Sequence, residues 1–479
     1  MRRLRVLFCT PEFVCTPEFG DYVQVGGLGA VSSALPRALR SIADVRVIVP
    51  GYSQVLAAFH TLEIVAECPP IAGMPACSIA RSETADGLSI YVVVCPQLFE
   101  RDGGPYGDVN GVDWPDNDVR FARYAAAAAW VADGGIPDWR ADLVHANDWQ
   151  CGLIPAYLAW RGSSVQSLFT VHNLAYQGLF SHASAEKLGV PSAAFNIHGV
   201  EFHGQLSFMK SGLFYSNHIS TVSTNYAREI ITSEHGCGLD GLLRARAEQR
   251  RLTGILNGID ASWDPRRCPD LMPQFGPGEW KGRHLNALGV RREFGLALTR
   301  GPLFGLVARL VHQKGIDLVV QSAEAIAQAG GQLVIMGSGD AEIIKDLEQV
   351  QRRHPRSVGV MTQFKDSLAR RIFAGSDFTL LPSRFEPCGL SQMYAQRLGS
   401  LPIAHNTGGL ADTIADGKTG LLFNRASSDA FLGAICRAFA LFGRKRELHA
   451  MRRRAMACEY GWNTSASRYG SLYERLQLA

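Results

Sequence analysis

The sequence lacks the features of several large protein classes. Only 19% of its 479 residues are charged, below the about 25% of an average soluble domain, which argues against a disordered chain or a coiled coil. A formal net charge of +4 is too small to indicate nucleic acid or a membrane surface as the main partner. No run of residues approaches the roughly 20 apolar residues of a membrane-spanning helix. We therefore expect a well-packed protein that acts on neither nucleic acid nor membranes.

The cysteine pattern excludes a disulfide scaffold and a zinc site. The 11 cysteines are scattered, odd in number and contain no C-x-x-C pair. The first apolar run stops at Thr10-Pro11, which is too early for a signal peptide with its apolar core of about 7–15 residues. We therefore expect reduced thiols, a cytoplasmic location and a first strand that is buried.

Short apolar runs alternate with helical patterns along the chain. The runs are bounded by Gly, Pro and Asn and are hydrophobic almost throughout, as in strands covered on both faces. In the first half the expected strands are 5–8, 45–49, 90–94, 143–145, 165–171, 219–222 and 255–256. In the second half they are 303–307, 332–336, 358–361, 378–381, 401–404 and 421–423. This alternation predicts an α/β fold with parallel sheets.

A polar stretch rich in Pro and Arg, from Trp263 to Arg283, separates the two halves. Each half is long enough for a core of its own and has about the length of a doubly wound domain. We therefore predict two Rossmann-like domains, residues 1–262 and 263–460, with the boundary at this stretch.

A Gly-Gly-Leu motif occurs once in each half, at 26–28 and at 408–410. The first motif follows the first strand and the second follows the strand at 401–404, and each precedes a helical pattern. Paired glycines let the backbone approach a ligand closely, and the helix N-terminus offers unpaired N–H groups to an anion. A single motif is more often an ordinary turn. The pair favours one anionic ligand that both halves contact across a cleft.

Charged residues follow two strands of the second half, at the carboxyl ends where open α/β sheets bind ligands. Arg309 and Lys314 follow 303–307, and their planar fork and point charge suit a diphosphate. Glu386 stands between an aromatic residue and a proline after 378–381. That is an unusual place for a carboxylate that only improves solubility, so we expect a site residue there.

Polar residues follow strands of the first half as well. Asp148 follows 143–145, and Asn257 follows 255–256. A lone histidine after a strand is usually a core residue, but His172 lies in a polar loop with Asn173 and Tyr176, which favours contact with a ligand. There is no P-loop, no G-x-S-x-G elbow and no H-E-x-x-H motif, so a P-loop NTPase, an α/β-hydrolase and a zinc protease are not indicated.

Taken together, these segments resemble bacterial glycogen synthases and plant starch synthases, the ADP-glucose-dependent glucosyltransferases of glycosyltransferase family 5. The resemblance covers nearly the whole chain. Its strongest parts are 170–178, 225–230, 238–243, 256–260, 308–315, 382–390 and 407–413. It implies the GT-B fold, in which two Rossmann-like domains face each other across a cleft. It also implies that the final helix, residues 461–479, returns to the N-terminal domain.

The resemblance implies retaining transfer of glucose from ADP-glucose to the 4-hydroxyl of an α-1,4-glucan, without a metal or other cofactor. Arg309 and Lys314 would neutralise the diphosphate, and its other contacts would be Gly26, Gly27, Thr407, Gly408 and Gly409. The donor sugar would be contacted by Glu386, Cys388, Gly389 and Leu390, and the reacting face by Asp148, His172, Asn173, Tyr176 and Asn257. Phe364 would stack on adenine where the family commonly has Tyr. Nucleophile, electrostatic stabiliser and sugar ligand all stay open for Glu386.

The first Gly-Gly loop departs from the family pattern Lys-x-Gly-Gly-Leu-x-Asp, because Gln24 replaces Lys and Ala30 replaces Asp. Loss of one charge-assisted contact by Gln24 costs roughly 1.5–3 kcal/mol, and less if the two lost charges paired with each other. Two alternatives therefore remain. One is a glycosyltransferase of the same fold with another nucleotide-sugar donor or another acceptor. The other is a weakened homologue that binds glucan or has a regulatory role.

Overall fold

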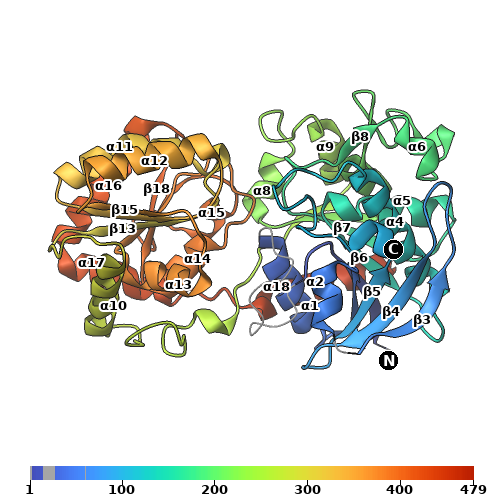
Figure 1. Ribbon diagram of the computed structural model, residues 1–479, viewed down its shortest axis with the longest axis horizontal. Helices are drawn as coiled ribbons and strands as arrows, with labels where there is room; N and C mark the ends of the chain where they lie inside the picture. The colour runs from blue at the N-terminus through green and yellow to red at the C-terminus, as the bar shows by residue number, and fades with distance from the viewer. Residues whose placement is uncertain (1–2, 14–26, 60, 479) are drawn as a thin grey trace. The chain divides into compact units, whose positions relative to one another are not determined.

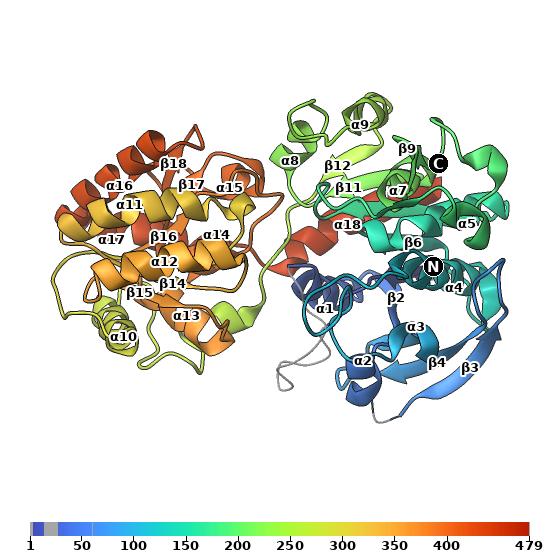
Figure 2. The same cartoon turned by 45° about the horizontal axis from the view of Figure 1, so that its top comes forward.

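A computed structural model describes residues 3–13, 27–59 and 61–478 of the chain. It consists of two compact units, which Figures 1 and 2 show in two orientations. Unit 1 comprises residues 1–258 and 462–479, and unit 2 comprises residues 259–461. The structure thus divides the chain after Gly258 and after Gly461, whereas the sequence analysis sets the divisions after residues 262 and 460. None of the described helices is long and apolar enough to cross a membrane.

Unit 1 is built on a mixed sheet with the strand order β12-β11-β7-β6-β1-β2-β5-β4-β3. Its strands are β1 (Leu4–Cys9), β2 (Ala43–Pro50), β3 (Glu63–Cys68), β4 (Cys77–Glu83), β5 (Ser89–Val94), β6 (Leu143–Asn147), β7 (Gln166–Val171), β11 (His218–Thr221) and β12 (Leu252–Gly254). Neighbours from β12 to β5 are parallel, whereas β4 pairs antiparallel with both β5 and β3. The predicted parallel α/β fold is confirmed. The predicted strand at 255–256 is wrong, because β12 ends before it.

The remaining elements of unit 1 pack around this sheet or form a small second sheet in the order β8-β10-β9. These strands are β8 (Leu179–Ser181), β9 (Glu201–Phe202) and β10 (Gln205–Ser207). The helices are α1 (Gly27–Leu39), α2 (Ser53–Ala58), α3 (Pro96–Phe99), α4 (Asn117–Trp130), α5 (Leu153–Trp160), α6 (Ser184–Lys187), α7 (Phe208–Tyr215), α8 (Thr224–Glu229), α9 (Asp240–Glu248) and α18 (Trp462–Leu478). Helix α5 packs against α4 and α7, and α1 packs against α18. Helices thus bury the apolar strands that the sequence pattern indicates.

The C-terminal helix α18 is held on unit 1 by hydrogen bonds to buried groups. The Tyr473 hydroxyl lies 2.7 Å from Nδ1 of His145 on β6, and the other ring nitrogen of His145 lies 2.6 Å from the Thr170 hydroxyl. The Ser465 hydroxyl donates to the backbone oxygen of Leu256 at 2.6 Å. Because α18 anchors on β6 and on the segment after β12, it supports the strands whose ends carry site residues.

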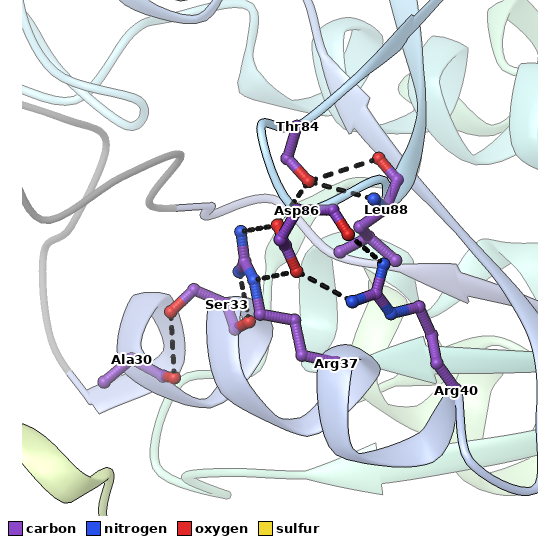
Figure 3. A network of polar contacts seen from close by, with 7 residues as sticks. All are labelled: Ala30, Ser33, Arg37, Arg40, Thr84, Asp86 and Leu88. Carbon is purple, nitrogen blue, oxygen red and sulfur yellow. Dashed lines mark hydrogen bonds and ion pairs between the residues drawn. The ribbon is translucent and has the colours of Figure 1, made fainter.

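The turn between β4 and β5 fixes the C-terminal half of α1 (Figure 3). The Asp86 carboxylate accepts hydrogen bonds from Nε of Arg37 at 3.1 Å and from Nη2 of Arg40 at 2.9 Å. The Thr84 hydroxyl donates to the same carboxylate at 2.6 Å, which orients it toward the helix. The charge and hydrogen bonds of Asp86 therefore set the position of the helix that follows the first Gly-Gly motif.

Unit 2 is a parallel sheet with the order β15-β14-β13-β16-β17-β18. Its strands are β13 (Leu303–Val307), β14 (Gln332–Met336), β15 (Val358–Met361), β16 (Phe378–Leu381), β17 (Leu401–His405) and β18 (Leu421–Phe423). The helices are α10 (Trp280–Glu293), α11 (Ile316–Gln328), α12 (Ala341–Arg353), α13 (Asp366–Gly375), α14 (Ser391–Arg397), α15 (Gly408–Thr413), α16 (Ser428–Gly443) and α17 (Lys445–Met456). Helices α11, α12 and α16 lie on one side of the sheet and α10, α13 and α17 on the other (Figure 1). This is the doubly wound arrangement expected from the sequence.

A buried ionic cluster ties the second helical layer of unit 2 to its sheet. Asp377 accepts from Nη2 of Arg452 on α17 at 2.5 Å and from Nη1 of Arg283 on α10 at 3.4 Å. Burial by itself raises the pKa of Asp377. The two guanidinium groups lower this pKa by more than burial raises it, so the net shift is downward. The backbone N–H of Leu303 donates to the same carboxylate at 2.9 Å. Both oxygens of the buried carboxylate are therefore hydrogen-bonded, and its charge is opposed by two cations.

Candidate active site

The polar residues predicted in unit 1 gather at one edge of its sheet. Asp148 directly follows β6, His172 directly follows β7, and Asn257 lies three residues beyond the end of β12. These strands belong to the parallel part of the sheet, so their carboxyl ends meet at the same edge. That edge is where open α/β sheets bind ligands.

Asp148 is held in an unusual conformation and environment. It has a φ of 61° although it is not glycine, a conformation that costs of order 1–3 kcal/mol and is found mainly at functional sites. Its residue is only 8% exposed, and its Oδ1 accepts from the backbone N–H of His172 at 3.3 Å. Burial raises its pKa to about 7, against the lowering effect of the His172 and Asn173 N–H groups. This carboxyl group therefore changes charge near neutral pH.

Asn147 fixes the tautomer of His172. The Asn147 side-chain NH2 group donates to the backbone oxygen of Cys9 at 3.0 Å and to that of His145 at 3.2 Å. Its oxygen must therefore face Nε2 of His172, 3.0 Å away, and Nε2 must carry the proton. Burial lowers the pKa of His172 to about 3, so the ring is neutral at physiological pH. Its Nδ1 is then a hydrogen-bond acceptor.

Three further predicted residues of unit 1 lie in the loops at this edge. The side-chain oxygen of Asn173 accepts from the N–H of Ala175 at 3.1 Å, which shapes the loop after β7. Tyr176 in the same loop is 48% exposed. Asn257 is buried, and its side-chain oxygen has no hydrogen-bond partner within the described part of the chain. An unpaired buried amide oxygen is costly, so Asn257 needs a donor from a ligand or water.

Glu12, a buried carboxylate after β1, was not among the residues predicted from the sequence. Its Oε1 accepts from the Tyr106 hydroxyl at 2.6 Å, and its Oε2 accepts from the N–H of Gly29 in the first turn of α1 at 3.2 Å. Its charge also raises the pKa of Asp148. The only sequence signal was its place just after the first strand, because Tyr106 lies far away in the chain.

The first Gly-Gly loop is largely outside the residues that the structure describes. The predicted site residues Gln24 and Gly26 fall in this segment. Gly27 is the first residue of α1 and is exposed. Ala30, where the family pattern has Asp, lies in the first turns of the same helix. The structure therefore places only the helical side of this loop.

In unit 2 the predicted charged residues form a compact cluster. Nζ of Lys314 lies 2.5 Å from Oε2 of Glu386, and the Ser383 hydroxyl donates to the same oxygen at 3.0 Å. The Glu386 residue is 8% exposed. Its Oε1 has no hydrogen bond to any residue that the structure describes. Lys314 therefore forms an ion pair with one oxygen of Glu386, and the other carboxylate oxygen can accept a hydrogen bond from a ligand.

The loops after β13 and β16 are bound to each other around this ion pair. Arg384 makes a two-pronged contact with Asp317, with both N–O distances at 2.8 Å. The Arg384 N–H donates to the backbone oxygen of Gln313 at 2.9 Å, and the Gln313 side chain donates to the oxygen of Phe385 at 3.2 Å. These contacts hold Lys314 and Glu386 in fixed positions, which charge stabilisation in a reaction requires.

The second Gly-Gly motif makes room for the loop that carries Glu386. A Cβ on Gly408 would lie 1.8 Å from the backbone oxygen of Glu386, and one on Gly409 would lie 2.0 Å from that of Cys388. The N–H of Gly409 donates to the Glu386 oxygen at 3.0 Å. The glycines therefore permit a close approach of the protein's own backbone, and the Gly409 N–H is already used.

The other predicted residues of unit 2 surround the same edge of its sheet. Arg309 follows β13 and is exposed, and Phe364 follows β15 and is 58% exposed. Thr407 and Cys388 are buried, Gly389 and Leu390 are half-buried, and all four follow β16 or β17. Among the described residues there is no group of three or more His, Cys, Asp or Glu that could hold a metal ion. The cations at this edge are therefore arginine and lysine.

The two edges differ in chemistry. The edge in unit 1 offers a neutral imidazole, a buried amide oxygen and a carboxyl group that ionises near neutrality. The edge in unit 2 offers a lysine–glutamate pair, an exposed arginine and an exposed aromatic ring. The first set suits an uncharged polyhydroxy ligand, and the second suits a charged ligand that carries an aromatic base.

Comparisons with known proteins match each of the two units to a different family model. A family model described as "Starch synthase catalytic domain" matches residues 5–245, and one described as "Glycosyl transferases group 1" matches residues 301–440. Glycogen synthase 1 of Bradyrhizobium diazoefficiens is 58% identical over 457 residues, which cover 95% of this chain and 99% of that protein. Glycogen synthase of Pseudomonas fluorescens is 52% identical over 462 residues, with 96% and 95% coverage.

A solved structure extends the likeness to the fold. The catalytic domain of Starch Synthase IV from Arabidopsis thaliana, bound to ADP and acarbose, is 29% identical and superposes with a TM-score of 0.88 over 100% of both chains. Both predicted Rossmann-like domains thus have counterparts in a GT-B enzyme. The chain is a glycosyltransferase and belongs to the family of bacterial glycogen synthases and plant starch synthases.

Proposed function

We propose that this chain transfers glucose from ADP-glucose to the 4-hydroxyl at the non-reducing end of an α-1,4-glucan, with retention of configuration and release of ADP. The observation that carries the proposal is the fixed pair of Lys314 and Glu386 beside the 407–409 turn. A pure glucan-binding protein has no use for a cation placed to accept a leaving diphosphate. Membership of the glycogen synthase family supports the same activity.

In this proposal the cations of unit 2 stabilise the departing ADP. Arg309 and Lys314 neutralise the diphosphate, while Thr407 and Gly408 line its path, and Phe364 stacks on the adenine. Lys314 is hydrogen-bonded to Glu386, so its charge is divided between that carboxylate and the donor phosphate. Fixed charges of this kind need no reorganisation as the bond to the leaving group breaks, which lowers the barrier.

Glu386 is proposed to act on the donor sugar through Oε1. Its Oε2 is held by Lys314 and Ser383, so Oε1 is the oxygen able to accept a sugar hydroxyl or stabilise positive charge at the anomeric carbon. Cys388, Gly389 and Leu390 continue the same loop and would contact the remaining sugar hydroxyls. These contacts favour a role as stabiliser and sugar ligand over that of a mobile nucleophile.

The polar edge of unit 1 is proposed to hold the glucose and the acceptor. Nδ1 of His172 and the side-chain oxygen of Asn257 are hydrogen-bond acceptors that suit sugar hydroxyls. Asp148, with a pKa of about 7, either accepts from a hydroxyl or donates to it according to pH. Asn173 and Tyr176 extend this set along the loop after β7. The acceptor 4-hydroxyl would then attack from the face that ADP leaves.

The experiment that tests the proposal is a panel of donors with one acceptor. Purified chain is incubated with glycogen and ADP-, UDP- or GDP-glucose, and the released nucleoside diphosphate and the product linkage are measured. We expect ADP release, new α-1,4 linkages and loss of activity in Glu386→Gln. Release of UDP or GDP in preference to ADP would identify another donor. No release by a folded protein that still binds glucan would identify the weakened homologue instead.

A further inference from the structure

Two cysteines face each other at the edge of the sheet of unit 1. Cys68 ends β3, Cys77 begins β4, and the two are a directly opposed pair in the antiparallel register. Opposed residues in such a pair have Cβ atoms about 4.5–5.5 Å apart, close to the about 3.5–4.5 Å of a disulfide. Both are free thiols, and each lies close enough to the other to shift its pKa. A small movement would therefore suffice to join them.

A buried arginine without a counter-charge lies beside this pair. Arg123 on α4 is 0% exposed. Its Nη2 donates to the backbone oxygen of Cys68 at 2.9 Å and to that of Pro69 at 3.0 Å. Its Nε and Nη1 have no hydrogen-bond partner, and no carboxylate pairs with it within the described residues. A buried cation is costly unless an anion or acceptors compensate it, so this environment favours a negative charge nearby.

The sulfur of Cys68 is placed to supply that charge. The hydrogen bond from Cys77 lowers the pKa of the Cys68 thiol, and the positive charges of Arg123 and Arg161 lower it further against the effect of burial. The pKa of Cys77 lies above its ordinary value, because its hydrogen bond to Cys68 and its burial both favour the protonated form. The pair thus combines one nucleophilic sulfur with one thiol that holds its proton.

We infer that Cys68 and Cys77 form a redox-modification site, in which a peroxide oxidises Cys68 and Cys77 converts the product into a disulfide between β3 and β4. The Cys68 thiolate attacks one peroxide oxygen, so that an S–O bond forms, the O–O bond breaks and hydroxide leaves. The Cys77 sulfur then attacks the sulfenic sulfur of Cys68, and the S–S bond replaces the S–O bond. In total, two thiols and one hydrogen peroxide give one disulfide and two waters. An added thiol reverses the reaction.

The position of β3 gives a small oxidant a route to the buried sulfurs. β3 is the last strand of the sheet, and all its residues except Cys68 are half-buried or exposed. Strands with few buried contacts open locally at a lower free energy than the core does. Transient opening at the end of β3 would therefore expose Cys68 without global unfolding.

A second pair of buried cysteines in unit 1 is a natural control. The Cys151 thiol donates to the backbone oxygen of Cys9 at 3.5 Å, and both residues are 0% exposed. Burial raises the pKa of both thiols, and among the described residues no cation opposes this effect at Cys9. The Cys9–Cys151 pair thus resembles the Cys68–Cys77 pair in proximity and burial, but among the described residues it has no counterpart of the Arg123 guanidinium. If Arg123 is the cause of reactivity, Cys9 and Cys151 must stay reduced when Cys68 oxidises.

The test uses the full chain with the exposed cysteines Cys237 and Cys436 replaced by serine. The protein is treated with hydrogen peroxide, blocked with iodoacetamide, digested and analysed by mass spectrometry. We expect the peptide that contains both Cys68 and Cys77 to carry an internal disulfide, about 2 Da lighter than its reduced form, that disappears with dithiothreitol. Its formation should be at least about 10-fold faster than any oxidation of Cys9 or Cys151.

Two sets of variants separate the steps. In Cys77→Ser the sulfenic acid on Cys68 should persist and be trapped by dimedone, because the resolving thiol is gone. Arg123→Met should slow oxidation of Cys68 by about 10-fold or more, whereas Arg123→Lys should retain most of the rate. Circular dichroism checks that each variant is folded. If Arg123→Met does not fold, the inference is tested by dimedone trapping in Cys77→Ser and by comparing the oxidation rate of Cys68 with those of Cys9 and Cys151. Oxidation of Cys68 no faster than that of Cys9, or no Cys68–Cys77 linkage, would overturn the inference.

Discussion

Unit 1 and unit 2 differ in how their buried titratable groups are stabilised. In unit 1 burial disfavours the charged forms of several groups: it lowers the pKa of His145 and His172 to about 3 and raises that of Asp148 to about 7. In unit 2 buried charges are kept and paired, as in Asp377 with Arg452 and Lys314 with Glu386. The difference matches the proposed ligands, because neutral groups suit glucan hydroxyls and paired charges suit a diphosphate.

This comparison also separates structural ion pairs from the pair proposed to act on the ligand. The Asp377 cluster holds α10 and α17 on the sheet, while the Lys314–Glu386 pair lies at the ligand edge of the same sheet. Both are ion pairs, but only the second has a carboxylate oxygen without a hydrogen bond among the described residues. In the structural cluster both oxygens of Asp377 are hydrogen-bonded, whereas the Lys314–Glu386 pair leaves one carboxylate oxygen for a ligand.

The largest effect is expected from Asp377→Asn in unit 2. Removing this carboxylate leaves Arg452 and Arg283 buried without a counter-charge, which should lower the free energy of unfolding by about 3–5 kcal/mol. Urea unfolding measures the change, with exposed Asp346→Asn on α12 as the control. A loss below about 1 kcal/mol would show that water compensates the arginines and would weaken the contrast between the units.

Lys314→Ala should reduce turnover by about 10²–10³, because it removes a fixed charge at the proposed leaving group. Affinity for glycogen should change far less, since the acceptor is assigned to unit 1. Initial rates of ADP release and a glycogen co-sedimentation assay give the two numbers. Lys345→Ala, an exposed lysine on α12, is the matched control. Equal losses in rate and in glucan affinity would contradict the division between diphosphate and glucan.

His145→Gln should remove a pH-dependent part of the stability of unit 1. In the folded protein His145 stays neutral down to about pH 3, whereas the unfolded chain binds a proton below its ordinary pKa of about 6.5. The contribution of His145 is therefore present above about pH 6.5 and is lost as pH falls toward 3. Between pH 7 and 5 this loss amounts to about 2 kcal/mol. The difference in unfolding free energy between wild type and His145→Gln should shrink accordingly, and a difference independent of pH would refute a neutral buried ring.

The smallest expected effect is that of Tyr473→Phe on α18. It removes a neutral hydrogen bond to His145 but keeps the ring, so the free energy of unfolding should fall by about 1 kcal/mol. The shift in the urea midpoint measures this loss. An effect as large as that of Asp377→Asn would mean that neutral and ionic anchors are equally important, and the contrast between the units would fail.

Much of the fold was predictable because buried parallel strands have a strong sequence signal. The apolar runs 303–307, 332–336 and 378–381 coincide with β13, β14 and β16. The edge strand β3 and its neighbour β4 went unnoticed because their apolar runs are short and both strands are partly exposed. The strand predicted at 255–256 failed because the apolar Ile255, which is buried, and Leu256, which is half-buried, lie beyond the last ladder pair of β12.

For the candidate site, too, only part could be predicted from the sequence. The places of Asp148, His172, Lys314 and Glu386 after strands were visible in the sequence. Their pairings were not: nothing in the sequence joins Lys314 to Glu386, Asn147 to His172 or Glu12 to Tyr106. The sequence also could not show that the backbone of Glu386 and Cys388 packs against the glycines of 408–409.

The sequence by itself determined the family, the alternation of strands and helices, and which residues stand at strand ends, because these follow from local order and periodicity along the chain. Only the tertiary structure decided which charges are paired, which histidines stay neutral and which cysteines meet. Such properties depend on the burial and the neighbours that each side chain acquires from distant segments. Arg123 illustrates the point: its place on α4 was within reach of sequence reasoning, but its lack of a counter-charge beside Cys68 appears only once β3, β4 and α4 have packed together.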